Sequence, residues 1–400
     1  MPEQVRAAAS QEQRRFLQFT MRQLLLLLAV SGVLLGIVAP RIHQTFRSWR
    51  QEQTDRRINS ATRDLVAAVN SNDVSLARRL LEAGADPNAV AETFRNRVIV
   101  TSIKRGHVDM LKLLLDFGAN PEGTERAHFD SPSGEGLPFC VAVGCQQPSE
   151  VRCQMIRVLV AAGADPLIEG GGRNAMDIAV HESDSQMGDL LREYGLPYGP
   201  REMVAFGRLE ELRLAVQSDP EIVKQRFSSL WARQTQDDEP TLLALSLFRG
   251  NREMSLFLID AGSPLDTRQH LGRTLLHEAA IGGDPELVRL LVARGLDVNA
   301  VDAHVKESPL QFACRRDNVE VVAALLEAGA DLNYQDASGD TSLHGAVWGN
   351  RVEIVRPLLA AGADPTIANM KGEAPLDVAR ARHPELVGLL EQAAEGLSKE

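Results

Sequence analysis

A phrase of the form Leu-Leu-x-x-Gly-Ala-Asp-Pro returns along most of this chain, and its spacing constrains the fold more than any other feature. Its glycines are Gly84, Gly118, Gly163, Gly195, Gly262, Gly295, Gly329 and Gly362. The successive differences between these sequence numbers are 34, 45, 32, 67, 33, 34 and 33. The interval of 67 is close to two periods, and the interval of 45 is one period with an insertion. Such a regular period is typical of proteins built from stacked repeats.

The clearest copy of the repeat predicts two helices joined by a tight turn. Thr341 is a favourable N-cap for a short helix over about 342–348. Asn350 tolerates the left-handed backbone that a chain reversal requires. A second helix over about 352–361 has its apolar residues at i, i+3 and i+4, and Gly362 ends it. One such unit cannot bury its own apolar face, so the pattern predicts an all-α array in which each unit covers the next.

This unit resembles the ankyrin repeat. The family signature Thr-Pro-Leu-His-x-Ala appears as the run Thr341 to Ala346, and it returns from Thr274, Ser308 and Ala374. The resemblance covers residues 58–396 and implies an ankyrin solenoid of about ten helix-turn-helix units, with polar-faced caps at its ends. It also implies that His277 and His344, at the signature position, hydrogen-bond within the turns between units.

Breaker residues divide the array into two predicted subarrays. The run 194–200 contains three glycine or proline positions before Pro200 and separates residues 58–198, with about four units, from residues 199–396, with about six. An insertion is expected near 144–153 in the first subarray. The second should carry an irregular finger over 228–240, which is too long for an ordinary turn.

Residues 23–40 contain 18 positions without a charge. As a helix they span about 27 Å, close to the hydrocarbon thickness of a bilayer. Because nothing in a solenoid would enclose so apolar a helix, we expect a single transmembrane helix between a basic tail, 1–22, and a polar spacer, 41–57. A cleaved signal peptide is the alternative, but Pro40 directly follows the small-residue site and disfavours cleavage.

Charge and composition bear on partners and compartment. The segment 1–57 carries a net charge of +5 and the remainder −16, so the array is a poor match for a phosphate backbone and nucleic acid is excluded as a partner. Arginines flank 23–40 on both sides, and the positive-inside rule barely discriminates between orientations. A short N-terminal tail before such a segment favours repeats outside the cytoplasm. An excess of arginine over lysine, 37 to 6, suggests a bacterial source, so the repeats would lie on the periplasmic side of the inner membrane.

Four cysteines are the other chemically distinctive residues. Cys314 occupies a small-residue position of a first helix and is expected to be buried. Cys140, Cys145 and Cys153 surround the insertion, and a Cys145–Cys153 disulfide would clamp it in an oxidising compartment; unpaired thiols are the alternative. Zinc is disfavoured because the spacing matches no familiar ligand pattern. We predict no metal site, no cofactor and, since no nucleophile–base–orienter set occurs, no enzyme activity.

The resemblance implies that the first helices and the turns between units line a concave binding face. One position of this face holds Phe248, Ile281, Arg315 and Trp348 at the repeat period, and the next position adds Arg249 and Arg316. A stripe of this composition is typical of interface hot spots, whereas packing of Phe248 and Ile281 between helices is the alternative. Residues expected at the turn tips extend the surface: Arg268, His270, His304, Lys306, Gln335, Ser338, Met370 and Lys371.

Together these features predict a membrane-tethered, non-catalytic scaffold that binds a protein partner through its concave face. The locally basic stripe favours an acidic partner surface. Two alternatives remain open from the sequence. One is an immunity-type inhibitor of a secreted toxin, which would use the same face, and the other is an envelope factor in oxidative-stress defence, which a bonded or reactive Cys145–Cys153 pair would favour.

Overall fold

The computed structural model describes residues 60–90, 97–122, 137–168, 174–227 and 239–397. These residues form helices and turns, with three isolated β-bridges and no extended strand among them. The predicted tail, anchor and spacer, 1–57, lie outside the described ranges. Within those ranges, no helix is both long and apolar enough to cross a membrane.

The chain divides into two compact units, Met1–Thr124 and Glu125–Glu400. In the first unit, helical residues 60–71 are followed by α3 (Val74–Glu82), α4 (Val98–Lys104) and α5 (Val108–Asp116). Helix α5 packs against both α3 and α4. Its Leu111 and Leu114 are fully buried, so the predicted one-sided apolar pattern is confirmed for this helix.

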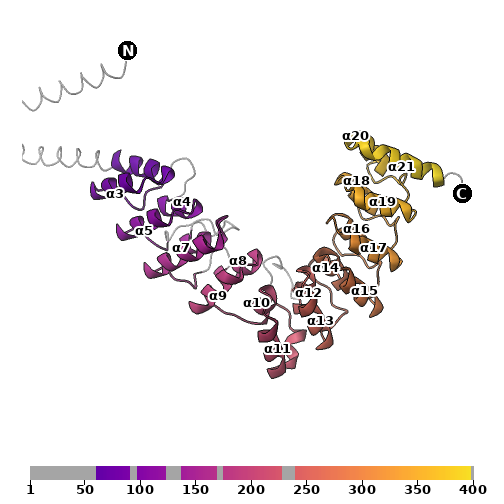
Figure 1. The fold of residues 1–400 in the computed structure, drawn as a ribbon, viewed down its shortest axis with the longest axis horizontal. Helices are drawn as coiled ribbons and strands as arrows, with labels where there is room; N and C mark the ends of the chain where they lie inside the picture. Colours follow the sequence, from indigo (N-terminus) through magenta and orange to yellow (C-terminus); the bar gives the residue numbers. More distant parts are fainter. Residues whose placement is uncertain (1–59, 91–96, 123–136, 169–173, 228–238, 398–400) are drawn as a thin grey trace, which may run out of the picture. The chain divides into compact units, whose positions relative to one another are not determined.

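In the second unit, shorter first helices of six to eight residues alternate with longer second helices (Figure 1). The first helices are α6 (Pro138–Gly144), α8 (Ala175–Glu182), α10 (Pro200–Ala205), α12 (Leu242–Phe248), α14 (Leu275–Gly282), α16 (Pro309–Cys314), α18 (Ser342–Trp348) and α20 (Pro375–Arg382). The second helices are α7 (Ser149–Ala161), α9 (Ser185–Glu193), α11 (Leu209–Ser218), α13 (Arg252–Asp260), α15 (Pro285–Ala293), α17 (Val319–Glu327), α19 (Val352–Ala360) and α21 (Pro384–Leu397). Two 3₁₀ helices, η1 (Pro220–Lys224) and η3 (His270–Gly272), lie in the connections.

Local geometry in the clearest repeat follows the sequence expectation. Helix α18 begins directly after Thr341, whose N–H and hydroxyl both contact Nδ1 of His344. Asn350 has φ +53° and Gly362 has φ +95°, so the two predicted left-handed positions are confirmed. Helix α19 ends at Ala360, one residue before the predicted end.

A continuous apolar core runs through the second unit from Val204 to Leu390. Each first helix contributes a buried leucine or alanine face, and neighbouring first helices pack on one another, as α12 does on α14 and α14 on α16. Burial at each interface depends on the next unit, which is the physical reason that the array grows in one dimension.

The division between the two compact units falls at Thr124. The join between two subarrays at 198/199 stays a prediction. The predicted join lies inside the second unit, where α8 and α10 stack more sparsely than other neighbouring first helices. Polar side chains bridge this junction instead: Arg201 Nη2 lies 2.7 Å from Asp177 Oδ1, and Arg208 pairs with Asp189.

The predicted insertion near 144–153 is largely helix rather than loop. Helix α7 begins at Ser149 and has 13 residues, against nine in α13, α15, α17 and α19, so part of the extra length extends a helix. Cys153 is buried within α7, and Cys145 Sγ lies 3.5 Å from the carbonyl oxygen of Ala142. None of the four cysteines forms a disulfide in the structure, which therefore lacks the predicted Cys145–Cys153 bond.

Burial also makes these thiols less reactive. It raises the pKa of both Cys145 and Cys153 above the ordinary value, and it raises that of Cys314 to about 12. Because the thiolate is the reactive form, this environment disfavours nucleophilic or redox chemistry. No cluster of three potential metal ligands occurs in the described part of the chain.

Most of the predicted finger, residues 228–238, lies outside the described ranges. Its two ends meet, since the N–H of Phe227 donates to the carbonyl of Pro240 at 3.1 Å. Arg226 Nη1 also donates to the carbonyl of Glu239 at 2.9 Å and to that of Arg268 at 3.1 Å.

Candidate functional site

The predicted stripe lies at the C-terminal ends of four first helices. Phe248 and Trp348 are the last residues of α12 and α18, Ile281 is near the end of α14, and Arg315 follows α16. The side chains of Phe248 and Trp348 are 45% and 40% exposed, respectively, and Arg315 is exposed, whereas Ile281 is half-buried. The alternative of ordinary packing therefore applies in part to Ile281 but not to the two aromatic residues.

Two cations flank the ring of Trp348. Lys371 Nζ lies 5.6 Å and the Arg382 guanidinium 5.0 Å from the ring centroid, both within cation–π range. Lys371 is one of the predicted turn-tip residues, but Arg382, the last residue of α20, is not. The repeat period could have predicted Arg382 as a residue of this face, because Arg316, Gly349 and Arg382 follow one another at intervals of one period.

Arg315 is held by a buried carboxylate. Its guanidinium pairs with Glu307 and lies 5.2 Å from the ring centroid of Phe312. A hollow of about 510 Å³ opens between Arg315 and Trp348, and Arg351 and Asp340 also line it. The charge of Arg315 is thus partly neutralised, whereas Arg316 is exposed and forms no ion pair with a described residue.

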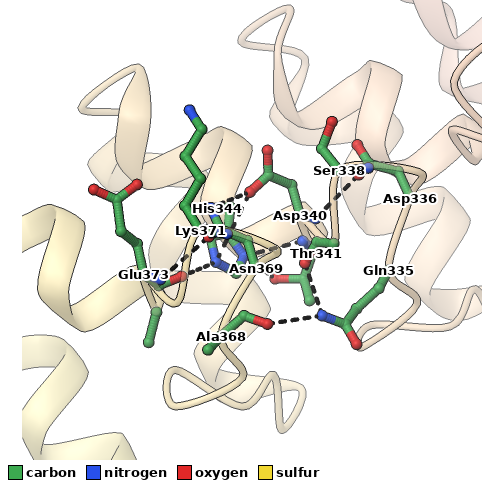
Figure 2. A network of polar contacts seen from close by, with 12 residues as sticks. Gln335, Asp336, Ser338, Asp340, Thr341, His344, Ala368, Asn369, Lys371 and Glu373 are labelled. Carbon is green, nitrogen blue, oxygen red and sulfur yellow. Dashed lines mark hydrogen bonds and ion pairs between the residues drawn. The ribbon is translucent and has the colours of Figure 1, made fainter.

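Neighbouring turn tips are tied together by polar contacts (Figure 2). Gln335 Nε2 donates to the carbonyls of Gly339 and Ala368 at 2.8 and 3.0 Å. Arg268 Nη1 does the same two units earlier, to the carbonyls of Gly272 and Val301 at 2.7 and 2.8 Å. These two predicted binding residues therefore join adjacent turns, and these hydrogen bonds of Arg268 use only Nη1 of its guanidinium.

The signature histidines act as predicted. The N–H of Thr341 donates to His344 Nδ1 at 3.0 Å, so Nε2 carries the proton and donates to the carbonyl of Glu373, also at 3.0 Å. His277 makes the equivalent contacts with Thr274 and with the carbonyl of Glu307. Burial lowers the pKa of His277 to about 4, which keeps its ring neutral at physiological pH.

The remaining turn-tip residues separate into two groups. Most of them are exposed: His304, Lys306, Ser338, Met370 and Lys371. Among the described residues, Met370, at 80%, is the most exposed large apolar side chain. His270 is only half-exposed, and its Nδ1 is buried without a hydrogen-bond partner. It lies with Phe248 and Arg249 at a second, larger hollow.

This larger hollow has a volume of about 780 Å³. Helices α8, α10, α12 and α14 and the turn containing η3 line it, so it draws on three successive first-helix junctions. Its apolar wall includes Phe227, Leu245, Phe248 and Leu271. Sequence reasoning missed this hollow because it lies where α8 and α10 stack sparsely. The sequence of a single repeat does not show how closely it packs on the next one.

Glu278 lies in the wall of the same hollow and is almost fully buried. Burial raises its pKa to about 7, although the Arg273 guanidinium, 3.2 Å away, opposes that shift. The folded chain therefore holds a proton on Glu278 between about pH 4.5 and 7 that the unfolded chain releases. This group contributes most stability below about pH 4.5, and the contribution is lost as pH rises through 7.

Glu278→Gln should remove this pH dependence. From pH 5 to pH 8, the free energy of unfolding of the wild type should fall by about 2 kcal/mol more than that of the variant. Urea denaturation followed by circular dichroism at the two pH values measures this difference, and the titration of His277 is common to both proteins and cancels. An equal difference at both pH values would show that Glu278 is ionised throughout.

Known proteins share this repeat over much of the chain. Family models described as ankyrin repeats match residues 65–115, 212–302 and 301–369, which together exceed half of the sequence. The E3 ubiquitin-protein ligase KEG of Arabidopsis thaliana is 26% identical over 298 residues, which are 69% of this chain but 17% of the ligase. The B-cell lymphoma 3 protein homolog of Mus musculus is 38% identical over 138 residues, 34% of this chain and 31% of that protein.

The chain thus spans less than a third of the length of these curated relatives. The matched regions include the stretches that the ankyrin repeat models match in this chain. This chain belongs to the ankyrin repeat family.

Proposed function

We propose that this protein is a non-catalytic, membrane-tethered scaffold of about ten ankyrin units that binds a protein partner through the face formed by its first helices and turns. The observation that carries the proposal is the exposure of Phe248 and Trp348 at one repeat position on separate units. Aromatic side chains and arginines dominate binding energy at protein interfaces, and an isolated soluble array gains nothing by exposing them.

The tether rests on residues 23–40, whose uncharged length suits one bilayer crossing. A periplasmic array on a bacterial inner membrane remains the favoured arrangement. Deletion of 23–40 should move the chain from the membrane pellet to the soluble fraction. If the shortened chain stays in the pellet after carbonate washing, the tether is contradicted.

Trp348→Ala should weaken partner binding by about 30-fold or more, because a desolvated tryptophan anchor is worth at least about 2 kcal/mol. The partner is first identified by placing a photo-crosslinking residue at position 348 of the intact chain, and its affinity is then measured by calorimetry. Arg315 is a poor choice for this test, since its loss leaves the buried Glu307 carboxylate unpaired.

Leu256→Ala is the matched control. Leu256 is an exposed apolar residue on α13, a second helix, and its 39% exposure equals that of Trp348 within one percentage point. A crosslinker at 256 should not recover the partner, and the substitution should not change affinity. Recovery of the same partner from both positions, or full affinity in Trp348→Ala, would place the interface elsewhere.

A further inference from the structure

The larger hollow lies where two first helices stack sparsely and an arginine spans the junction. Helices α8 and α10 pack sparsely, and Arg249, which follows α12, reaches past α10 to α8. Its guanidinium donates to the carbonyl of Val180 and to the hydroxyl of Ser183. Both acceptors are neutral, so these contacts position the guanidinium without neutralising its charge.

Arg249 differs in this respect from the other arginines of the hollow. Arg201 pairs with Asp177 at 2.7 Å and with Glu202 at 2.6 Å, and Arg273 pairs with Glu278 at 3.2 Å. Arg249 forms no ion pair with a described carboxylate, and its Nε is buried without a hydrogen-bond partner. Burial alone lowers its pKa, with no charged neighbour acting against it. A half-buried guanidinium without a carboxylate is unusual, because its partial desolvation is uncompensated.

Several apolar side chains line the same hollow as this charge. Phe248 and Leu271 expose 45% and 39% of their surface, and Phe227 and Leu245 lie half-buried beside them. A hollow of about 780 Å³ lies within the size range of sites that enclose a bulky group, and such sites combine apolar walls with few, well-placed polar groups. The acids in the wall lie against other arginines, Asp177 against Arg201 and Glu278 against Arg273, so neither pairs with Arg249.

We propose that this hollow receives a peptide segment of the protein partner in which a bulky apolar side chain adjoins an aspartate or glutamate. The apolar side chain lies between Phe248 and Leu271, and the carboxylate pairs with Arg249. This inference rests on the proposed protein-binding function and assigns it a recognition element. The carboxylate supplies the countercharge that Arg249 lacks, and a charge-assisted hydrogen bond to its guanidinium fixes the direction of the bound segment.

The test uses the intact chain and a defined set of probes. A library of random twelve-residue peptides displayed on phage is selected on the wild-type protein, and enriched peptides are synthesised with their acidic residue intact or replaced by its amide. We expect enrichment of bulky apolar residues next to an acid. Affinities for the acid and amide peptides are then measured with wild type, Arg249→Ala and Arg249→Lys.

Arg249→Ala should weaken the acid peptide about 10- to 100-fold and leave the amide peptide almost unchanged. Arg249→Lys should restore part of the loss, since it keeps the charge but not the planar fork. Arg316→Ala is the matched control, because Arg316 occupies the same repeat position two units later but is exposed and lines neither hollow. It should weaken neither peptide.

Comparing the acid and amide peptides distinguishes recognition of the carboxylate from an effect of the substitution on folding. If Arg249 only stabilises the junction with α8, its loss weakens the acid and amide peptides equally, and the proposal is overturned. Selection of peptides without an acid, or no selection at all, also overturns it. If the peptide test fails but partner binding still depends on Trp348, the proposed function stands and only the inference about the hollow is overturned. The failure of the inference can therefore be told apart from the failure of the proposed function.

Discussion

Replacing Asp184 by alanine should cost about 3–5 kcal/mol of the free energy of unfolding, because it leaves a buried guanidinium unpaired. Arg152 Nη2 lies 2.5 Å from Asp184 Oδ2, and the two side chains are only 10% and 7% exposed. Arg152 Nη1 also donates to the carbonyl of Val143 at 2.6 Å. The arginine is thus fixed at the end of α6, where it cannot turn toward water when its partner is removed.

Asp184 has further roles that alanine cannot fulfil. Its carboxylate accepts hydrogen bonds from Ser149 Oγ at 2.8 Å and from the N–H of Met187 at 3.0 Å. It therefore caps α9 and joins α9 to the start of α7, and a lost N-cap alone costs about 1 kcal/mol. These contacts belong to one network, so their losses are not additive.

Native-state hydrogen exchange of the intact chain measures this effect, because a repeat array can open locally without global unfolding. Protection in α7, α8 and α9 should fall, while α16 to α19 remain protected. Asp189→Ala is the control: its carboxylate pairs with Arg208, but its side chain is 49% exposed, so the loss should stay below about 1 kcal/mol. Equal losses in the two variants would refute the buried-charge argument.

Gly282→Ala should cost about 3 kcal/mol or more, because α14 leaves no room for a methyl group against α12. A Cβ atom at this position would lie 1.8 Å from the carbonyl oxygen of Leu247 and 3.0 Å from the backbone nitrogen of Gly250. Both are backbone atoms, so relief requires moving one helix relative to the other. Forced overpacking usually costs about 1–3 kcal/mol when side chains can adjust, and here they cannot.

Gly388→Ala provides the matched control. Gly388 lies within α21, and a Cβ there would meet no atom within 4 Å. Alanine should stabilise this helix by up to about 1 kcal/mol, since it loses less backbone entropy than glycine. Thermal unfolding of both variants tests the comparison, with a lower melting temperature expected for Gly282→Ala alone. A similar rise in both would mean that α12 and α14 separate at little cost.

Local signals predicted the repeat well because they act within one unit. The contact between Thr341 and His344 joins positions i and i+3, and the left-handed Asn350 and Gly362 are set by local sterics. The helix bounds of α18 and α19 therefore followed from the residues themselves. The period also placed Phe248 and Trp348 at exposed, equivalent positions.

The sequence says less where a side chain contacts another unit. Arg268 and Gln335 are predicted at turn tips of the binding face, and each reaches carbonyls of its own turn and of the next unit. Arg249 and Arg316 occupy equivalent positions, yet only Arg249 reaches back to an earlier helix. The difference comes from the sparse stacking of α8 and α10, which no residue near Arg249 signals.

By itself, the sequence determined the period, the pairing of helices and the apolar face of each unit, because these depend on turn sterics and on spacings of i+3 and i+4. Only the tertiary structure decided which arginines are paired, where the two hollows open and which turn-tip side chains remain exposed. Those properties depend on the offset between stacked units, and this offset is set by packing between residues one or two repeat periods apart.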